Sequence, residues 1–152
     1  MSNFETSIET TASAEQVMAV LTNPDAIRDW SPVPFELDGL ASESLQTGSE
    51  ARVSGNLAGL RVGFDVTVHS ATHDGLRLSA DGPVALDVTY GLRPSATGSA
   101  VSASVSLARS KGLSARLIGK ATEALLAAGA LERAAGRIAR AAETVVPAPV
   151  AI

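Results

Sequence analysis

The stretch SAEQVMAVLTNPDAIRDWSP, residues 13–32, contains two consecutive helix-start signals. In the first, Ser13 is followed three residues later by Gln16, which is a capping-box pattern. Val17, Val20 and Leu21 then follow at helical spacing. A short helix is therefore expected from about residue 14.

The second helix-start signal is Asn23 followed by Pro24. Asparagine caps helix N-termini well, and proline suits the first helical position because its missing N–H has no intrahelical partner there. Each proline in Ser31-Pro32-Val33-Pro34 disfavours helical geometry in the residue before it. A second short helix is therefore expected to end near Trp30.

Outward from these helices, apolar and polar residues alternate with the period of strands that have one buried face. Asp74-Gly75 and Asp81-Gly82-Pro83 are typical of the short turns between these segments. Short connections join antiparallel neighbours, so the sheet is expected to be a meander. The expected strands are 4–10, 35–43, 49–57, 60–71, 76–81, 84–93 and 99–108.

The alternation also assigns faces, because successive strand side chains point to opposite sides of a sheet. Val62, Phe64 and Val66 share one face, while Arg61 and Asp65 share the other. The same parity places Leu86, Val88, Tyr90, Val101 and Ala103 on the inward face.

From Leu113 to about Glu143 the chain has no proline and is rich in Ala, Leu, Arg and Glu, which predicts one long helix. At about 1.5 Å per residue, such a helix is long enough to cross the whole sheet. The apolar stripe expected to face the sheet is Leu117, Ala121, Ala124, Leu125, Ala128, Leu131, Ala135, Ile138 and Ala142. A single domain is expected over residues 1–145, and residues 146–152 are expected to form a flexible C-terminal tail.

Composition narrows the classes of function. The 152 residues suit one domain, 45% are hydrophobic and only 3% are aromatic, so an aliphatic core is expected. The net charge of −4 argues against broad attraction to nucleic acid, and the absence of cysteine excludes disulfides and thiol nucleophiles. No secretory signal or membrane-spanning apolar run is found, so a soluble, cytoplasmic protein without stable membrane insertion is expected.

The order of strand, two short helices, antiparallel meander and long C-terminal helix resembles the helix-grip fold of the START/Bet v 1-like (SRPBCC) superfamily. Residues 13–32 look like the opening helices of its polyketide cyclase/dehydrase and lipid-transport-like branch, and Leu45-Gln46-Thr47-Gly48-Ser49 resembles that branch's loop before the third strand. The resemblance covers residues 4 to about 143. It implies an α+β fold in which a seven-stranded curved antiparallel sheet grips the C-terminal helix around an apolar cavity.

Members of that superfamily include lipid and sterol carriers, hormone receptors, polyketide aromatase/cyclases and chaperone activators, so the fold alone does not define a function. Aromatase/cyclases of the superfamily place polar and ionisable groups in the pocket. Here the inward strand positions carry valine, leucine and alanine, with Tyr90 and Thr6 as the polar exceptions. This departure disfavours cyclase activity.

The two histidines do not form a metal or catalytic pair. His69 is expected on the solvent face of its strand and His73 in a turn, whereas a metal needs three or four convergent ligands. No catalytic residue, metal or cofactor is therefore assigned. Two alternatives stay open for Tyr90, a hydrogen bond within the fold or one to a ligand, and two for Trp30, a core anchor or a gate at the cavity entrance.

The leading hypothesis is a protein that binds or transports a small hydrophobic, lipid-like or polyketide-like molecule. One alternative is an enzyme of the polyketide cyclase/dehydrase type that uses Tyr90. The other is a protein-interaction module that docks a partner, for instance through the basic stripe of Arg133, Arg137 and Arg140. The expected ligand-binding residues are Trp30, Phe35, Val62, Phe64, Val66, Leu86, Val88, Tyr90, Val101, Ala103, Leu117, Ala121 and Leu125.

Overall fold

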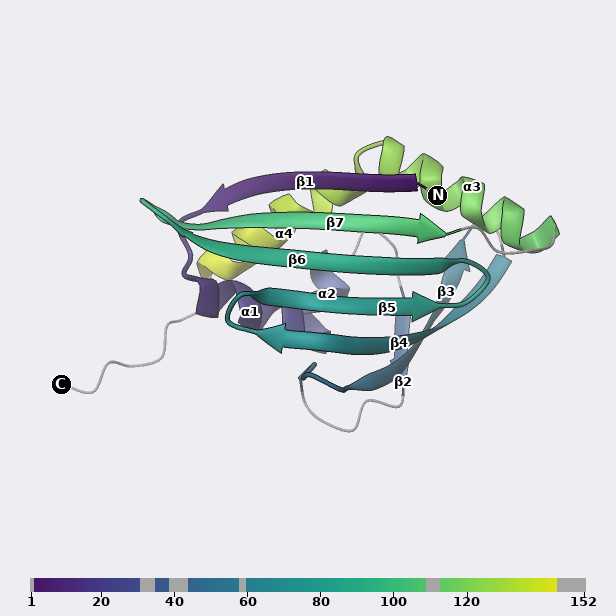
Figure 1. Cartoon of the computed structure of the whole chain (residues 1–152), viewed down its shortest axis with the longest axis horizontal. Coiled ribbons are helices and arrows are strands. Elements are labelled where there is room, and N and C mark those ends of the chain that lie inside the picture. The colour runs from purple at the N-terminus through teal and green to yellow at the C-terminus, as the bar shows by residue number, and fades with distance from the viewer. Residues whose placement is uncertain (1, 31–34, 39–43, 58–59, 109–112, 145–152) are drawn as a thin grey trace.

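The computed structural model (Figure 1) describes residues 2–30, 35–38, 44–57, 60–108 and 113–144. The prolines at 32 and 34 and the expected tail at 146–152 lie outside these residues. The elements are β1 (Ser2–Thr10), α1 (Ala14–Thr22), α2 (Pro24–Trp30), β2 (Phe35–Asp38), β3 (Glu50–Leu57), β4 (Leu60–Thr72), β5 (Gly75–Asp81), β6 (Ala85–Ser95), β7 (Gly98–Ala108), α3 (Leu113–Ala127) and α4 (Ala130–Thr144).

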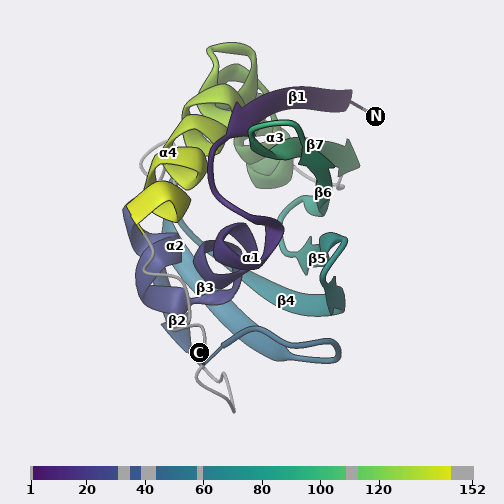
Figure 2. The same ribbon diagram turned by 90° about the vertical axis from the view of Figure 1, so that its left-hand side faces the viewer.

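The seven strands form one antiparallel sheet in the order β1-β7-β6-β5-β4-β3-β2. The sheet curves around the helices, which all lie on its concave side (Figure 2). The expected α+β helix-grip fold is confirmed. Strand bounds agree with the prediction to within about two residues, except in the part of 35–43 that lies outside the described residues.

Both helix-start signals act as the sequence indicates. The Ser13 hydroxyl accepts a hydrogen bond from the Gln16 amide at 3.2 Å, and the Gln16 side chain accepts one from the Ser13 amide at 2.8 Å. The Asn23 side chain accepts from the amide of Asp25 at 2.9 Å. These contacts satisfy N-terminal amides that would otherwise lack partners.

The expected single helix over 113–143 is wrong, because the chain breaks at Ala128-Gly129 into α3 and α4. Gly129 has a φ of +96°, a left-handed conformation that glycine adopts at little cost and that commonly ends helices. Its amide donates to the carbonyl of Leu126 at 3.2 Å, and the Arg133 guanidinium donates to the carbonyl of Ala128 at 3.0 Å. The freed carbonyls at the end of α3 are therefore partly satisfied.

The break gives the two helices different partners. Helix α4 packs on β1, α1 and α2, and its Ala134 and Ile138 belong to the main hydrophobic core. Helix α3 contacts both β1 and β3, which lie on opposite sides of the sheet's central strands. It therefore bridges these two strands at one end of the sheet, where Figure 1 shows it beside the strand ends. Within the described residues, no helix is long and apolar enough to cross a membrane.

Two glycine-to-alanine substitutions test the role of this break. Gly129→Ala is expected to lower the free energy of unfolding by about 1 kcal/mol, because a side chain disfavours the left-handed backbone. Gly136→Ala is the matched control inside α4, where an added Cβ meets nothing within 4 Å. It is expected to raise the free energy of unfolding by about 0.5–1 kcal/mol. Urea unfolding measures both, and equal effects would contradict the assigned role of Gly129.

Candidate functional site

The concave face of the sheet is apolar but not evenly buried. Near α1 and α2 its side chains are buried, as at Val68, Leu76 and Leu92, and they pack in the main core. At the other end, Val62, Val84 and Leu107 form a smaller buried cluster with Ile118 of α3. Between these ends lie half-buried side chains, here called the central patch: Phe64, Val66, Leu78, Leu86 and Val88.

Strand pairing makes the central patch continuous. Val88 of β6 pairs with Leu78 of β5, and Leu86 shares its cross-strand row with Val66 of β4 through the small Ala80. Phe64 lies two residues before Val66 on the same strand, so its side chain points to the same face. The patch thus spans three neighbouring strands at the middle of the concave face.

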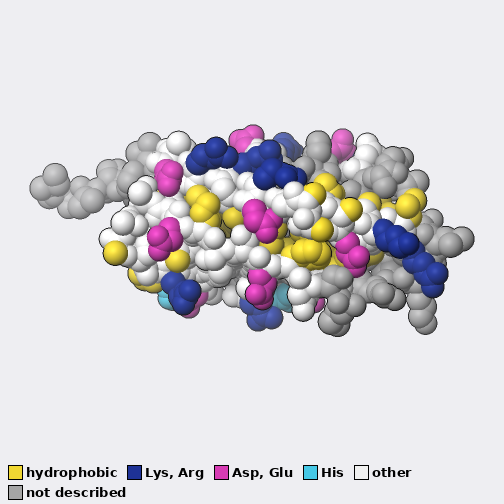
Figure 3. Space-filling model, turned by 90° about the horizontal axis from the view of Figure 1, so that it is seen from above, with side chains coloured by type: hydrophobic (Ala, Val, Ile, Leu, Met, Phe, Trp, Pro, Cys, Tyr) yellow, Lys and Arg dark blue, Asp and Glu magenta, His cyan; other side chains and the backbone are white. Residues whose placement is uncertain are grey.

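Helix α3 faces this patch with a mixed row of side chains. Ile118 is 3% exposed, and the half-buried Thr122, Leu125 and Leu126 follow it four, seven and eight positions later, on one side of the helix. The Thr122 hydroxyl already donates to the carbonyl of Ile118 at 2.8 Å. Seen from the side of β1 and the C-terminal helices, apolar side chains reach the surface in a band between charged ones (Figure 3).

Most expected site residues share the concave face. Val62, Val101 and Ala103 are buried there, Phe64, Val66, Leu86 and Val88 are half-buried, and Tyr90 lies in the main core. Phe35 of β2 is half-buried opposite Gly55, and Ala121 and Leu125 are half-buried on α3.

Leu117 is the exception, because its side chain is 51% exposed and does not join the others. Ala124 and Ala128, which belong to the same expected stripe, are exposed as well. Among residues 116–127 of α3 the buried one is Ile118, which the sequence analysis did not predict. The expected stripe was traced through one uninterrupted helix, whereas the break at Gly129 sets the faces of α3 and α4 independently.

Trp30 is a core anchor. It is 8% exposed, and its indole N–H donates to the carbonyl of Val20 in α1 at 3.2 Å. Its ring meets that of Tyr90 edge to face, with centroids 5.9 Å apart and planes at 76°. This contact joins α2 to the sheet, because the indole packs against one side of the phenol ring.

Tyr90 lies in a cross-strand row with Leu76, Ala103 and Thr6. It is 5% exposed, and burial raises the pKa of its phenol above the ordinary value. Among the residues that the structure describes, its hydroxyl has no hydrogen-bond partner. Tyr90 is therefore a neutral donor at the end of the central patch, next to Val88.

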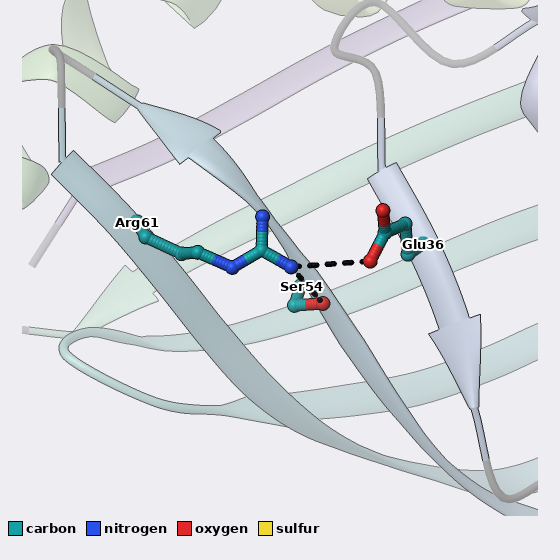
Figure 4. A network of polar contacts seen from close by, with 3 residues as sticks. All are labelled: Glu36, Ser54 and Arg61. Atoms are coloured by element: carbon teal, nitrogen blue, oxygen red, sulfur yellow. Dashed lines mark hydrogen bonds and ion pairs between the residues drawn. The ribbon is translucent and has the colours of Figure 1, made fainter.

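Charged side chains lie on the other face of the sheet. Arg61 contacts Glu36 at 3.1 Å and Ser54 at 3.4 Å, a network that joins β4, β2 and β3 (Figure 4). Arg52 and Asp65 form a second exposed pair at 2.8 Å. Since every described Lys and Arg is exposed, the concave face has no cationic group among the described residues.

The histidines lie away from the concave face. His69 is exposed and its imidazole lies 2.9 Å from the Ser79 hydroxyl, while the exposed His73 lies 3.3 Å from Asp74 in a turn. Over the described part of the chain, no three His, Asp or Glu side chains are grouped as metal ligands.

Comparisons with known proteins agree with this geometry. The family model described as "Polyketide cyclase / dehydrase and lipid transport" matches residues 1–143. No protein among those with curated functions matches the chain.

Solved structures show the same fold at low sequence identity. Protein TTHA0849 from Thermus thermophilus matches with a TM-score of 0.71 and 12% identity, over 93% of this chain and 97% of that one. Protein CV1439 from Chromobacterium violaceum has a TM-score of 0.62 and 16% identity, over 90% and 96% of the two chains. The Bet v 1-like protein Ara h 8.0201 has a TM-score of 0.60 and 9% identity, over 90% and 97%.

The raised pKa of Tyr90 predicts a loss of stability in alkali. Above about pH 10 the phenol ionises in the unfolded chain but stays protonated in the fold, so the unfolded state binds fewer protons. The free energy of unfolding then falls as pH rises, by up to about 1.4 kcal/mol per pH unit, whereas below about pH 10 this group causes no loss. Tyr90→Phe is expected to remove this contribution.

Urea unfolding of the parent and of Tyr90→Phe between about pH 9 and pH 12 checks this expectation. The variant should show the shallower decline. Identical slopes in the two proteins would mean that Tyr90 ionises as freely in the fold as in the unfolded chain.

Proposed function

The chain belongs to the polyketide cyclase/dehydrase and lipid transport family, within the START/Bet v 1-like superfamily. On that premise we propose that it binds a small hydrophobic molecule, lipid-like or polyketide-like, between the concave face of the sheet and α3. The observation that carries the proposal is the central patch. Large apolar side chains in the middle of the sheet, among them Phe64 and Leu86, stay half-buried, because the stronger contacts of α3 with the sheet fall on β1 and β3 to either side of them.

Affinity for such a molecule would come from the hydrophobic effect. Each Å² of apolar surface removed from water contributes about 25 cal/mol, and a ligand over the central patch would cover surface that the fold leaves accessible. The patch also joins buried apolar residues at both ends, Val62 on one side and Leu76 on the other. A bound apolar molecule would therefore extend the core.

The chemistry of the concave face favours binding over catalysis. General acid–base catalysis needs groups that exchange protons near the working pH. On the described concave face of the sheet Tyr90 is the one ionisable side chain, and burial moves its pKa further from neutrality. This supports a carrier or binding protein over the cyclase alternative.

A native mass spectrum of the purified protein, followed by titration with the neutral dye Nile red, tests the proposal. A retained lipophile, or saturable dye fluorescence that fatty acids, isoprenoids or aromatic polyketides reduce, is the expected result. A protein that carries no lipophile and binds neither the dye nor any of these compounds would contradict it.

Ala121→Trp tests where the ligand lies. Ala121 is half-buried on α3, so the larger side chain is expected to occupy the space over the central patch and weaken dye binding about tenfold or more. Ala124→Trp is the matched control, because Ala124 is exposed on the same helix and its substitution should leave binding within about twofold.

Thermal melts of both variants accompany the titrations. A folded Ala121→Trp protein that binds the dye as tightly as the parent would show that the site lies elsewhere.

A further inference from the structure

Tyr90 stands at the border between the filled and the open part of the concave face. Its row neighbours Leu76 and Ala103 are buried, while Val88, two residues earlier on the same face of β6, belongs to the central patch. The indole of Trp30 packs against the phenol from the side of α2. The phenol is thus held in place at one end of the space that the proposed ligand would occupy.

The hydroxyl of Tyr90 has hydrogen-bonding capacity that the described residues do not use. A phenol hydroxyl without a partner can still donate one hydrogen bond. Other hydroxyls near the helices are already engaged, since Thr122 donates to Ile118 and Thr10 donates to Glu143 at 2.8 Å. The buried hydroxyls of Ser95 and Ser99 also lack a partner among the described residues, but they lie beyond Tyr90 at the β6–β7 turn. Tyr90 is therefore the unpartnered donor next to the central patch.

The surroundings of that donor carry no compensating positive charge. Every described Lys and Arg is exposed, and Arg52 and Arg61 of the sheet are paired on the opposite face. An anionic ligand group beside Tyr90 would lose its hydration without gaining a cation, and burial of an unpaired carboxylate is far more costly than burial of a neutral carbonyl.

We infer that the site selects neutral lipophiles that carry a hydrogen-bond acceptor, such as an ester or a ketone, with the acceptor at the Tyr90 hydroxyl, and that it discriminates against carboxylates of the same chain. This inference rests on the proposed function and names its ligand class. The phenol donates, the carbonyl oxygen accepts, and the alkyl chain covers the central patch.

Displacement of Nile red by three probes of similar length tests the inference: methyl laurate, sodium laurate and tridecane. At neutral pH methyl laurate is expected to bind about fivefold more tightly than tridecane, because it adds one hydrogen bond in a buried site. Laurate, which is ionised at that pH, is expected to bind at least tenfold more weakly than its methyl ester.

Two variants separate the hydrogen bond from packing. Tyr90→Phe keeps the ring against Trp30 and is expected to remove the preference for methyl laurate over tridecane, with tridecane itself bound as before. Thr6→Val is the matched control, because it deletes the half-buried hydroxyl two strands away in the same row and should leave the preference intact.

The possible failures are distinguishable. If neither the dye nor any probe binds, the proposed function fails and this inference with it. If the probes bind but laurate binds as tightly as methyl laurate, the inference is overturned and hydrophobic binding stands. The same holds if Tyr90→Phe keeps the preference for methyl laurate over tridecane while Thr6→Val loses it.

Discussion

The left-handed backbone at Gly129 is the constraint on which the arrangement of the concave face depends. A continuous helix over residues 113–143 would have placed one unbroken stripe of apolar side chains against the sheet. Because the chain turns at Ala128-Gly129, α4 packs on β1 and on α1 and α2, while α3 bridges β1 and β3 at one end of the sheet. The concave face is therefore filled under α4, and the middle of the sheet keeps half-buried apolar side chains.

The sheet keeps its charges on one face and its apolar side chains on the other, and this sets what the concave side can recognise. Arg61, Glu36 and Ser54 interact on the outer face, where water screens them. On the inner face Tyr90 offers a neutral, directional donor in apolar surroundings. The inner face thus offers apolar area and one hydrogen-bond donor, the features that the proposed binding of an uncharged molecule would use.

The sequence predicted what local periodicity controls. Strand parity assigned the concave face, and the pairs Ser13–Gln16 and Asn23–Pro24 located two helix starts within a residue. The helix break escaped prediction because Gly119, Gly129 and Gly136 all lie in strongly helical sequence, and tertiary packing decides which of them adopts a positive φ. The burial of Trp30 likewise involves a long-range contact that local sequence does not reveal, that with Tyr90.

The accessible apolar surface of the concave face does not come from the abundance of small residues. Ala134 and Ala142 of α4 are at most 2% exposed, so short side chains there let the helix pack closely against its neighbours. The large side chains Phe64 and Leu86 are the ones left half-buried. Accessible apolar surface thus lies between two filled regions, the main core under α1, α2 and α4 and the cluster that Ile118 of α3 closes, and the placement of the helices rather than the volume of individual side chains determines where it lies.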